Sequence, residues 1–348
     1  MSSKIFIADL TGKDEIETYF LVKYQALQEA KDGKKYLNVV LTDASGDLEA
    51  RLWNATDEIA SRIVKNDFVK AKGKLNQFQG RRQFILSDIV KIPEAEINRD
   101  DYITKSAFSP DKMFAKLNSI VDELNDAYIR ELLQQILADQ EIARRLKVWP
   151  AGKTIHHAYQ SGLLEHIVSC AQLAVSLSRH YDVNHNYVVA GAILHDMCKV
   201  FELSEGPNVD YTEEGKLIGH LVKGLEIVDK FAARITNFPS GTRMHLKHIL
   251  LSHHGEYEYG SPKIPQTSEA YLVHLIDLMD SKMNALEMVK RSDSQTGNWT
   301  GFVKHLDRLV YRSDLPFYPE MLEPRAPRPE GNEIKQGLAK QLEGFKPK

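Results

Sequence analysis

The spacing of the apolar residues changes once along this chain, and the change limits the folds that the chain can adopt. Before residue 90 apolar and polar residues alternate in short runs separated by turn residues, which is typical of β-strands. From Asp111 to about Arg312 the apolar residues recur every three or four positions, as on one face of an α-helix. We therefore predict a multidomain β + α fold, in which a β-rich unit precedes an all-α unit.

The strand-like part has the order of a small barrel. Alternation begins over residues 5–10, and the predicted elements that follow are strands 20–27, 36–42 and 48–53, a short helix 55–64, and paired strands 67–75 and 82–89. Three strands, a helix and two strands are the layout of a five-stranded OB-fold barrel, which often binds oligonucleotides. The segment YLNVVLTDASGDLEARLW resembles the central hairpin of bacterial OB-folds of the tRNA-anticodon-binding type.

These patterns set the expected domain boundaries. The expected parts are an OB-fold domain over 1–92, a polar linker over 93–110, a helical domain over 111–315 and a tail over 316–348. The tail is rich in proline and is predicted to be partly disordered.

Composition narrows the setting in which the chain works. The start lacks the apolar run of a secretory signal, and no later apolar stretch approaches the roughly 20 residues that cross a bilayer. Without an export signal, Cys170 and Cys198 are expected to be reduced and buried, so a cytoplasmic location without a membrane partner is predicted. The net charge is −3, so any nucleic acid must bind a local basic surface.

The barrel offers such a local surface. Its candidate base-stacking aromatics are Tyr36, Trp53, Phe78 and Phe84, and its candidate phosphate-binding cations are Lys34, Lys35, Arg51, Lys70, Lys72, Lys74, Arg81 and Arg82. Arg81 and Arg82, at the predicted hairpin tip, are the strongest candidates among the cations. Small barrels also need aromatic residues in the core, so a purely structural role for these aromatics remains open.

The histidines are concentrated in one part of the chain. All but His305 of the 13 histidines lie between His156 and His274. Those with the strongest pattern end apolar, helix-like runs together with acids: His166, His195-Asp196, His220, His253-His254 and Asp277. Such runs can project imidazoles and carboxylates into one interior, and this mixture suits Mn, Fe, Co, Ni or Zn.

A phosphodiester is a substrate that such a cluster could hydrolyse. Two cations about 3.5–4 Å apart lower the pKa of a bridging water and hold phosphate oxygens. The carboxylate of Asp196 has two oxygens and could bridge both cations. Lys199, three residues later on the same helix face, could neutralise charge on the phosphoryl oxygens.

The order His…His-Asp…His…His-His…Asp resembles the HD superfamily in its two-metal form. The resemblance implies one metal held by His166, His195, Asp196 and Asp277, and a second held by His220, His253 and His254, with Asp196 bridging. Lys199 matches the lysine of the HD-x-x-K variant, which implies a catalytic role for Lys199 and Asp196.

A closer resemblance covers nearly the whole chain. The motifs HHAY at 156–159, GLLEH at 162–166, HHG at 253–255, YGSP at 259–262 and YLVHLIDLMDSKMN at 271–284 look like those of YhaM-type 3′→5′ exoribonucleases. This family implies removal of nucleotides from the 3′ end of single strands as nucleoside monophosphates, usually with manganese. Single-stranded RNA is the expected substrate, and DNA is a second candidate. The family also suggests a homo-oligomer.

The residues beside the predicted ligands receive separate interpretations. His156 and His157 match the family pattern upstream of His166 and could touch substrate phosphate, or equally brace the first helix. His274, three residues before Asp277, is expected to support a ligand.

Glu165 points about 100° away from His166 on a helix and is not expected to be a ligand.

Three other functions remain open from the sequence. A cyclic-dinucleotide phosphodiesterase would share the histidine order, but the Gly-Tyr-Pro element typical of that class does not follow His254. A phosphohydrolase of free nucleotides would have no obvious use for an OB-fold. A non-catalytic nucleic-acid-binding factor is disfavoured by the complete ligand set and by Lys199.

Overall fold

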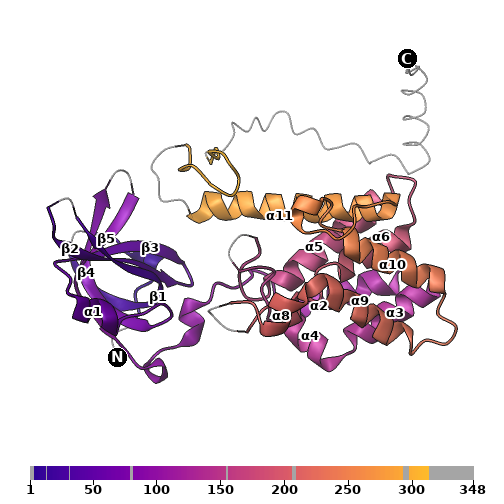
Figure 1. Cartoon of the computed structure of the whole chain (residues 1–348), viewed down its shortest axis with the longest axis horizontal. Helices are drawn as coiled ribbons and strands as arrows, with labels where there is room; N and C mark the ends of the chain where they lie inside the picture. Colours follow the sequence, from indigo (N-terminus) through magenta and orange to yellow (C-terminus); the bar gives the residue numbers. More distant parts are fainter. Residues whose placement is uncertain are drawn as a thin grey trace, which may run out of the picture.

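The structure is a computed structural model that describes residues 4–12, 14–30, 32–78, 81–153, 156–205, 209–292 and 298–312. It has a β-barrel and a helical unit joined by a linker, as Figure 1 shows with the barrel on the left. The predicted tail over 316–348 lies outside the described residues, as does the side chain of Arg81. The predicted boundary at residue 315 therefore stays a prediction.

The barrel is closed and five-stranded, as predicted. Its elements are β1 (Glu15–Glu29), β2 (Lys35–Asp43), β3 (Gly46–Trp53), α1 (Asp57–Arg62), β4 (Phe68–Phe78) and β5 (Arg81–Lys91). The strand order is β1-β2-β3-β5-β4, with β3 and β5 parallel and the other neighbours antiparallel. Inward residues alternate with outward ones, so Leu37, Val39 and Leu41 of β2 are fully buried.

The expectation of strand alternation over residues 5–10 was wrong. This segment contains the short 3₁₀ helix η1 (Ile7–Asp9), whose backbone bonds to side chains instead of to a neighbouring strand. The Ile7 amide donates to Asp43 Oδ2 at 2.9 Å, and Arg82 donates to the carbonyls of Ile7 and Leu10. Ile7 and Leu10 therefore pack into the barrel core without joining the sheet.

The helical unit is built from α2 to α11, and most of its buried apolar residues form one large hydrophobic cluster. Its helices are α2 (Pro110–Asp122), α3 (Ala127–Leu137), α4 (Gln140–Leu146), α5 (Gly162–Leu177), α6 (His185–Leu194), α7 (Lys199–Glu202), α8 (Glu213–Leu217), α9 (Gly219–Ala232), α10 (Ser240–Ser252) and α11 (Ser268–Ser292), with the 3₁₀ turn η4 (Tyr257–Tyr259) before α11. Side chains of Ser109, Asp126, Asp139 and Asn184 cap the first turns of α2, α3, α4 and α6.

Helix α6 lies at the centre of the helical unit. Every residue from Val188 to Leu194 is buried, so the helix has no solvent face. Gly191 allows this packing, because a Cβ there would lie 2.7 Å from Ile249 of α10 and 2.9 Å from Val273 of α11. The carboxyl end of α6 is therefore held rigidly in the interior, beside α5, α10 and α11.

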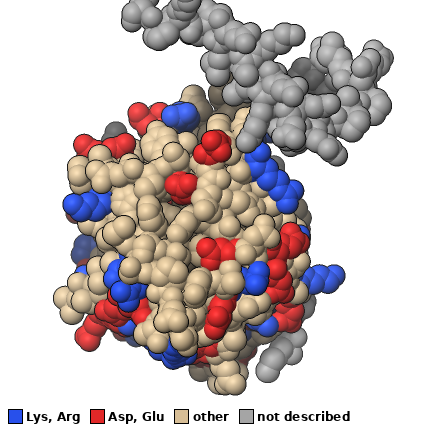
Figure 2. All heavy atoms as spheres, turned by 90° about the vertical axis from the view of Figure 1, so that its right-hand side faces the viewer, with Lys and Arg blue, Asp and Glu red and all other residues tan. Residues whose placement is uncertain are grey.

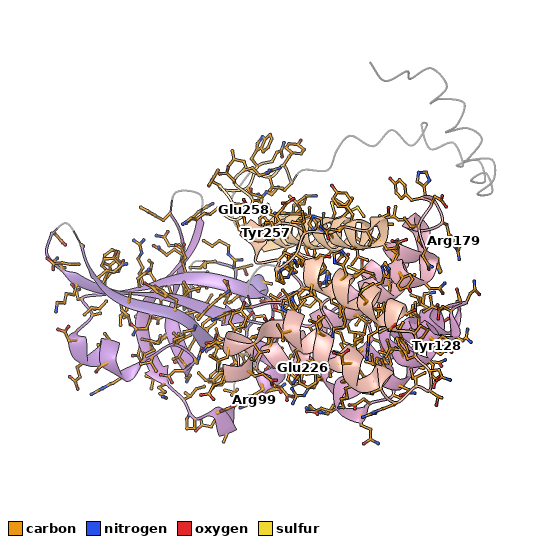
Figure 3. The ribbon with its side chains drawn as sticks, turned by 45° about the vertical axis from the view of Figure 1, so that its right-hand side comes forward. Arg99, Tyr128, Arg179, Glu226, Tyr257 and Glu258 are labelled. Atoms are coloured by element: carbon orange, nitrogen blue, oxygen red, sulfur yellow. The ribbon has the colours of Figure 1, made fainter. Side chains whose placement is uncertain are left out.

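The linker is bonded to both units. It contains the 3₁₀ helices η2 (Glu94–Glu96) and η3 (Arg99–Tyr102), and Figure 3 labels Arg99 between barrel and helices. On the barrel side, the Ala44 amide donates to the Asp101 carbonyl at 2.8 Å. On the helical side, the Gln160 amide donates to Thr104 and the Ser106 amide donates to Gln160, both at 2.9 Å. Although its composition is polar, the backbone of this segment is therefore hydrogen-bonded to the barrel at one end and to the helical unit at the other.

Helices in the described part of the chain are either too short or too polar to span a membrane.

We expect Gly73→Ala to destabilise the barrel. Gly73 lies where the β4–β5 register shifts, and a Cβ there would be 2.3 Å from the carbonyl oxygen of Ile85. Relieving that overlap requires a backbone shift, which costs about 1–3 kcal/mol. The measurement is denaturant unfolding followed by tryptophan fluorescence, to which Trp53 contributes the signal of the barrel. Gly241→Ala is the matched control, since nothing lies within 4 Å of its Cβ position and no loss of stability is expected; an equal effect of both substitutions would contradict the packing argument.

Candidate metal centre

Five helices bring the predicted ligands to one buried place. Helix α5 carries His166, the end of α6 leads into His195 and Asp196, and α9 begins with His220. His253 and His254 follow the last turn of α10, and Asp277 lies on α11. Figure 1 shows these helices packed together in the helical unit. The geometric expectation of the sequence, that these residues converge, is confirmed.

The first group of candidate ligands consists of His166, His195, Asp196 and Asp277. One ligand atom from each lies within 4.8 Å of the others. His166 Nε2 is 3.5 Å from Asp196 Oδ2, 3.4 Å from Asp277 Oδ1 and 3.0 Å from His195 Nε2. A cation bound among these atoms would have two imidazole and two carboxylate donors.

The second group consists of His220, His253 and His254, again with ligand atoms within 4.8 Å of one another. Asp196 connects the two groups. Its Oδ2 faces the first, whereas its Oδ1 is 3.4 Å from His220 Nε2 and 3.6 Å from His253 Nε2. One carboxylate therefore offers an oxygen to each group.

Several donor atoms in this centre lack a partner. Asp196 Oδ1, His220 Nε2, His253 Nε2 and His254 Nδ1 are buried and make no hydrogen bond in the described structure. Buried polar groups are nearly always satisfied, because an unpaired one costs about 1–3 kcal/mol. These atoms converge on the same space, so a divalent cation fits as their missing partner.

Backbone carbonyls orient two of the imidazoles. His195 Nδ1 lies 3.0 Å from the carbonyl of Ala192, and His253 Nδ1 lies 2.9 Å from that of Leu250. Each bond places the proton on Nδ1 and leaves the lone pair of Nε2 for the centre.

Carboxylates orient two further imidazoles, and sequence reasoning missed both. Asp280 Oδ2 lies 2.8 Å from His166 Nδ1, and both oxygens of Glu202 lie 3.0 Å from His220 Nδ1. A signal was available, because Asp280 follows Asp277 by three positions on α11 and therefore shares its helix face.

Burial and neighbouring charges fix the protonation of the centre. Burial, together with His253 and His220, lowers the pKa of His254 to about 3, so its imidazole is neutral and able to coordinate a metal. Burial alone would raise the pKa of Asp196, but Lys199 and the imidazoles outweigh burial and hold that pKa well below its usual value. Lys199 Nζ donates to Asp196 Oδ2 at 2.6 Å.

The cysteines are buried and free, as expected. Burial raises the pKa of Cys170 to about 11 and that of Cys198 to about 12, so both remain thiols. Cys170 Sγ is 3.7 Å from His166 Nδ1, yet a thiol is a poor metal ligand compared with the surrounding imidazoles.

His156 and His157 occupy different environments. The His157 side chain is 4% exposed, and its ring nitrogens lie 3.0 Å from the Tyr159 hydroxyl and 2.9 Å from Asp280. This geometry favours the bracing role over phosphate contact. The ring of His156 makes no hydrogen bond in the described structure and lies 6.1 Å from that of His166. Burial, followed by Lys199 and His166, lowers the pKa of His156 to about 4.

His274 and Glu165 lie as the sequence suggests. His274 Nδ1 bonds to the carbonyl of His253 at 2.8 Å, so it supports the turn that carries the paired histidines. Gly255 is required beside it, with φ of +84° and a Cβ position 2.2 Å from the His274 ring. Glu165 bonds to Tyr159 and Ser106, away from the candidate ligands.

Two expectations for the barrel need correction. Phe84 is fully buried and packs edge-on against Phe20, so it cannot stack on a base. The guanidinium of Arg82 donates hydrogen bonds to the carbonyls of Ile7 and Leu10, which favours a structural role over phosphate binding. Lys35, Lys70 and Lys72 form ion pairs with Asp57, Glu17 and Glu15, respectively.

We expect Glu202→Gln to weaken metal binding about 10–100-fold, because the amide cannot hold the His220 ring as the carboxylate does. The measurement is calorimetric titration of the metal-free protein with Mn²⁺. Glu205→Gln is the matched control, since the contact of Glu205 among the described residues is an exposed ion pair with Arg144 at 3.6 Å. Equal Mn²⁺ affinity in both variants would show that Glu202 does not support a ligand.

Models of known families match both units of the chain. The HD domain matches residues 163–282, and the OB-fold nucleic acid binding domain matches residues 22–92. The first match contains His166, His195-Asp196, His220, His253-His254 and Asp277.

Similar proteins include one relative that spans most of the chain. The 3′-5′ exoribonuclease YhaM of Oceanobacillus iheyensis is 34% identical over 323 residues, covering 91% of this chain and 98% of the relative. The second OB-fold domain of replication protein A from Methanococcus maripaludis is 20% identical with a TM-score of 0.23, covering 26% of this chain and 97% of that domain. An SSB domain from Synechococcus sp. is 18% identical with a TM-score of 0.21, covering 23% of this chain and 97% of that domain. On the similarity to YhaM, which extends over both the barrel and the helical unit, the chain belongs to the YhaM-type 3′→5′ exoribonuclease family.

Proposed function

We propose that the protein is a metal-dependent 3′→5′ exoribonuclease that releases nucleoside monophosphates from single-stranded RNA. The observation that carries this proposal is the buried carboxylate of Asp196, whose two oxygens face two separate groups of imidazoles and carboxylates. Such a centre suits two divalent cations, and we propose manganese as the native ion. The 3′→5′ direction and the RNA substrate are supported by the name of the similar YhaM protein.

The cations would activate water and hold the oxygens of the scissile phosphate. His166, His195, Asp196 and Asp277 would hold one of them, and His220, His253 and His254 the other, with Asp196 shared. Four of these imidazoles, those of His166, His195, His220 and His253, are held at Nδ1 before substrate arrives, which lowers the cost of reorganisation.

Lys199 and His156 are the side chains that we propose to act on the phosphate directly. Lys199 keeps its charge, because its interactions with Asp196 and Asp277 outweigh the burial that would lower its pKa. Its ammonium can stabilise negative charge that develops on the phosphoryl oxygens. The imidazole of His156 has no partner in the described structure and is partly exposed, so it is free to bond to phosphate.

The barrel has a surface suited to a single strand, which we name the aromatic platform: Tyr36, Arg51, Trp53 and Phe78. The rings of Tyr36 and Trp53 lie 5.0 Å apart, and the Arg51 guanidinium lies 5.5–6.0 Å from all three rings. Trp53 is 43% exposed and Phe78 is 50% exposed. Exposed rings beside a cation can stack on bases of any sequence.

The aromatic platform also favours the nuclease over a hydrolase of free nucleotides, which would need no second site for a strand.

The far end of the helical unit is less suited to RNA. Figure 2 shows that end, where acidic and basic residues are interspersed on a largely uncharged face. A strand of negative charge would find no concentrated positive patch among the residues drawn there. Use of DNA as a substrate, self-association and a cytoplasmic location remain predictions.

We expect Asp196→Asn to reduce the shortening of RNA by about a thousand-fold or more, because the amide cannot serve both metal groups. RNA binding should persist, since the aromatic platform is unchanged. The measurements are a ladder assay with Mn²⁺ on 5′-labelled RNA and a binding assay on the same strand. His180→Ala is the control, because the described structure gives the His180 ring a contact with Tyr181 and places it outside the candidate ligand groups. Undiminished shortening by Asp196→Asn would refute the proposal.

We expect Trp53→Ala to weaken the binding of single-stranded RNA by about 1–3 kcal/mol, the value of one base stacked on an aromatic ring. The measurement is the dissociation constant from fluorescence anisotropy at fixed salt concentration. Tyr181→Ala is the matched control, because Tyr181 is also an exposed aromatic at 52%. Its neighbour Arg179 is labelled in Figure 3 on the opposite side of the molecule from the barrel. A loss of affinity that is equal in both variants would remove the aromatic platform from the proposal.

A further inference from the structure

A chain of hydrogen bonds leaves the metal centre on the side of His166. Asp280 Oδ2 lies 2.8 Å from His166 Nδ1 and 2.9 Å from His157 Nε2, so one oxygen serves both imidazoles. The hydroxyl of Ser169 donates to the other oxygen of Asp280. The second ring nitrogen of His157 lies 3.0 Å from the hydroxyl of Tyr159. The position of the His166 ring is thus tied to residues that lie outside the candidate ligand set.

The chain continues from Tyr159 to the linker. The Tyr159 hydroxyl donates to Glu165 Oε1 at 3.0 Å, and the Ser106 hydroxyl donates to Glu165 Oε2 at 2.5 Å. The Ser106 amide also donates to the carbonyl of Gln160, the neighbour of Tyr159. We name the continuous set the linker relay: Ser106, Glu165, Tyr159, His157 and Asp280.

The linker relay is shielded from solvent. The side chains of His157, Asp280 and Glu165 are 4%, 11% and 19% exposed. Asn284 of α11 holds the middle of the relay, because its Oδ1 accepts from the His157 amide at 2.8 Å and its Nδ2 donates to the Tyr159 hydroxyl at 3.3 Å. With little water available as a substitute partner, the loss of one bond leaves a buried polar group unpaired.

The linker relay also lies between the metal centre and a large cleft. The cleft is lined by Ala44 and Ser45 of the barrel, Ser106 of the linker, and His157, Glu165 and Asp280 of the helical unit. The seven predicted ligands His166, His195, Asp196, His220, His253, His254 and Asp277 do not line it, whereas His157 and Asp280, which form a further possible metal group with His166, do. The relay thus faces the barrel–linker side of the cleft at one end and His166 at the other.

We propose that the residues of the linker relay are positioning residues that couple the docking of the linker, and with it the barrel, to the affinity of the centre for its cation. The barrel is attached to the linker, because the Ala44 amide bonds to the Asp101 carbonyl and Tyr102 packs against Phe68 with ring centroids 5.0 Å apart. Groups that orient a metal-binding imidazole typically contribute 10–100-fold to metal affinity. This inference rests on the proposed function only through the existence of the metal centre.

Coupling of this kind acts in both directions. If linker docking raises the affinity for the cation, then cation binding must stabilise the docked linker by the same factor. The second effect can be observed without any turnover of RNA, at the amides of Gln160 and Ser106, whose hydrogen bonds join the linker to the helical unit.

The test uses the full chain with Tyr159→Phe and, separately, Ser106→Ala. Tyr159→Phe removes only the hydroxyl that joins His157 to Glu165, and Ser106→Ala removes the last bond of the relay. Calorimetric titration with Mn²⁺ should show affinity about 10-fold weaker than wild type in both variants. Tyr187→Phe is the matched control, since its hydroxyl bonds to Thr242 at 3.1 Å and not to the relay; wild-type affinity is expected for it.

Hydrogen exchange supplies the second readout. Mn²⁺ should slow exchange at the amides of Gln160 and Ser106 in the wild type, and much less in Tyr159→Phe. Thermal unfolding of the metal-free proteins shows whether the fold itself has changed, and one cooperative transition is expected for each variant, with a midpoint lowered by only a few degrees because one buried hydrogen bond is lost. The coupling would be overturned by wild-type Mn²⁺ affinity in both relay variants, or by wild-type exchange rates at these amides that are the same with and without Mn²⁺. Either result would leave the metal centre intact. A wild type that binds no Mn²⁺ would instead overturn the proposed function, and the coupling with it.

Discussion

The buried carboxylate of Asp196 is the constraint on which the helical unit depends. Its side chain is 2% exposed, and a buried charge without compensation costs several kcal/mol. Lys199 compensates one oxygen, while the other faces His220 and His253, whose Nε2 atoms are themselves unpaired. Helices α5, α6, α9, α10 and α11 converge here, and each carries or leads into at least one of the candidate ligands around this carboxylate. The packing of α6 through Gly191 serves this convergence, because it brings the end of that helix into the interior.

The grouping of the candidate ligands could be predicted from the sequence, whereas their supporting residues could not. His166, His195, Asp196 and Asp277 each end or interrupt an apolar run, so burial and proximity followed from periodicity and from the HD resemblance. The sequence alone does not distinguish Asp280 from an exposed aspartate, because its role depends on where the Nδ1 atom of His166 points. That direction is a property of the packed helices α5 and α11, which no local pattern records.

In the barrel, too, the main elements could be predicted from the sequence, whereas the contacts that support them could not. Turn residues and alternation predicted its strands and their order, but residues 5–10 alternate and still form no strand. The buried residues of this segment, Ile7 and Leu10, are three positions apart, as on one face of a helical turn, and the apolar pattern does not report which groups satisfy the backbone. Here Asp43 and Arg82 satisfy it, from positions more than 30 residues away. The exposure of Trp53 and the burial of Phe84 likewise depend on strand register, which places Tyr36 opposite Trp53 on the outer face.

The linker shows that polar composition and rigidity are compatible. Residues 93–110 are rich in charge, yet their backbone pairs with Ala44 on one side and with Gln160 on the other. A tether that was free before binding would lose conformational entropy each time barrel and metal centre held one strand, and that loss would weaken binding. In this fold the entropy is lost once, when the chain folds, and the bonds of Asp101, Thr104 and Ser106 compensate it. The linker therefore joins the barrel to the helical unit through hydrogen bonds that are already formed in the folded chain.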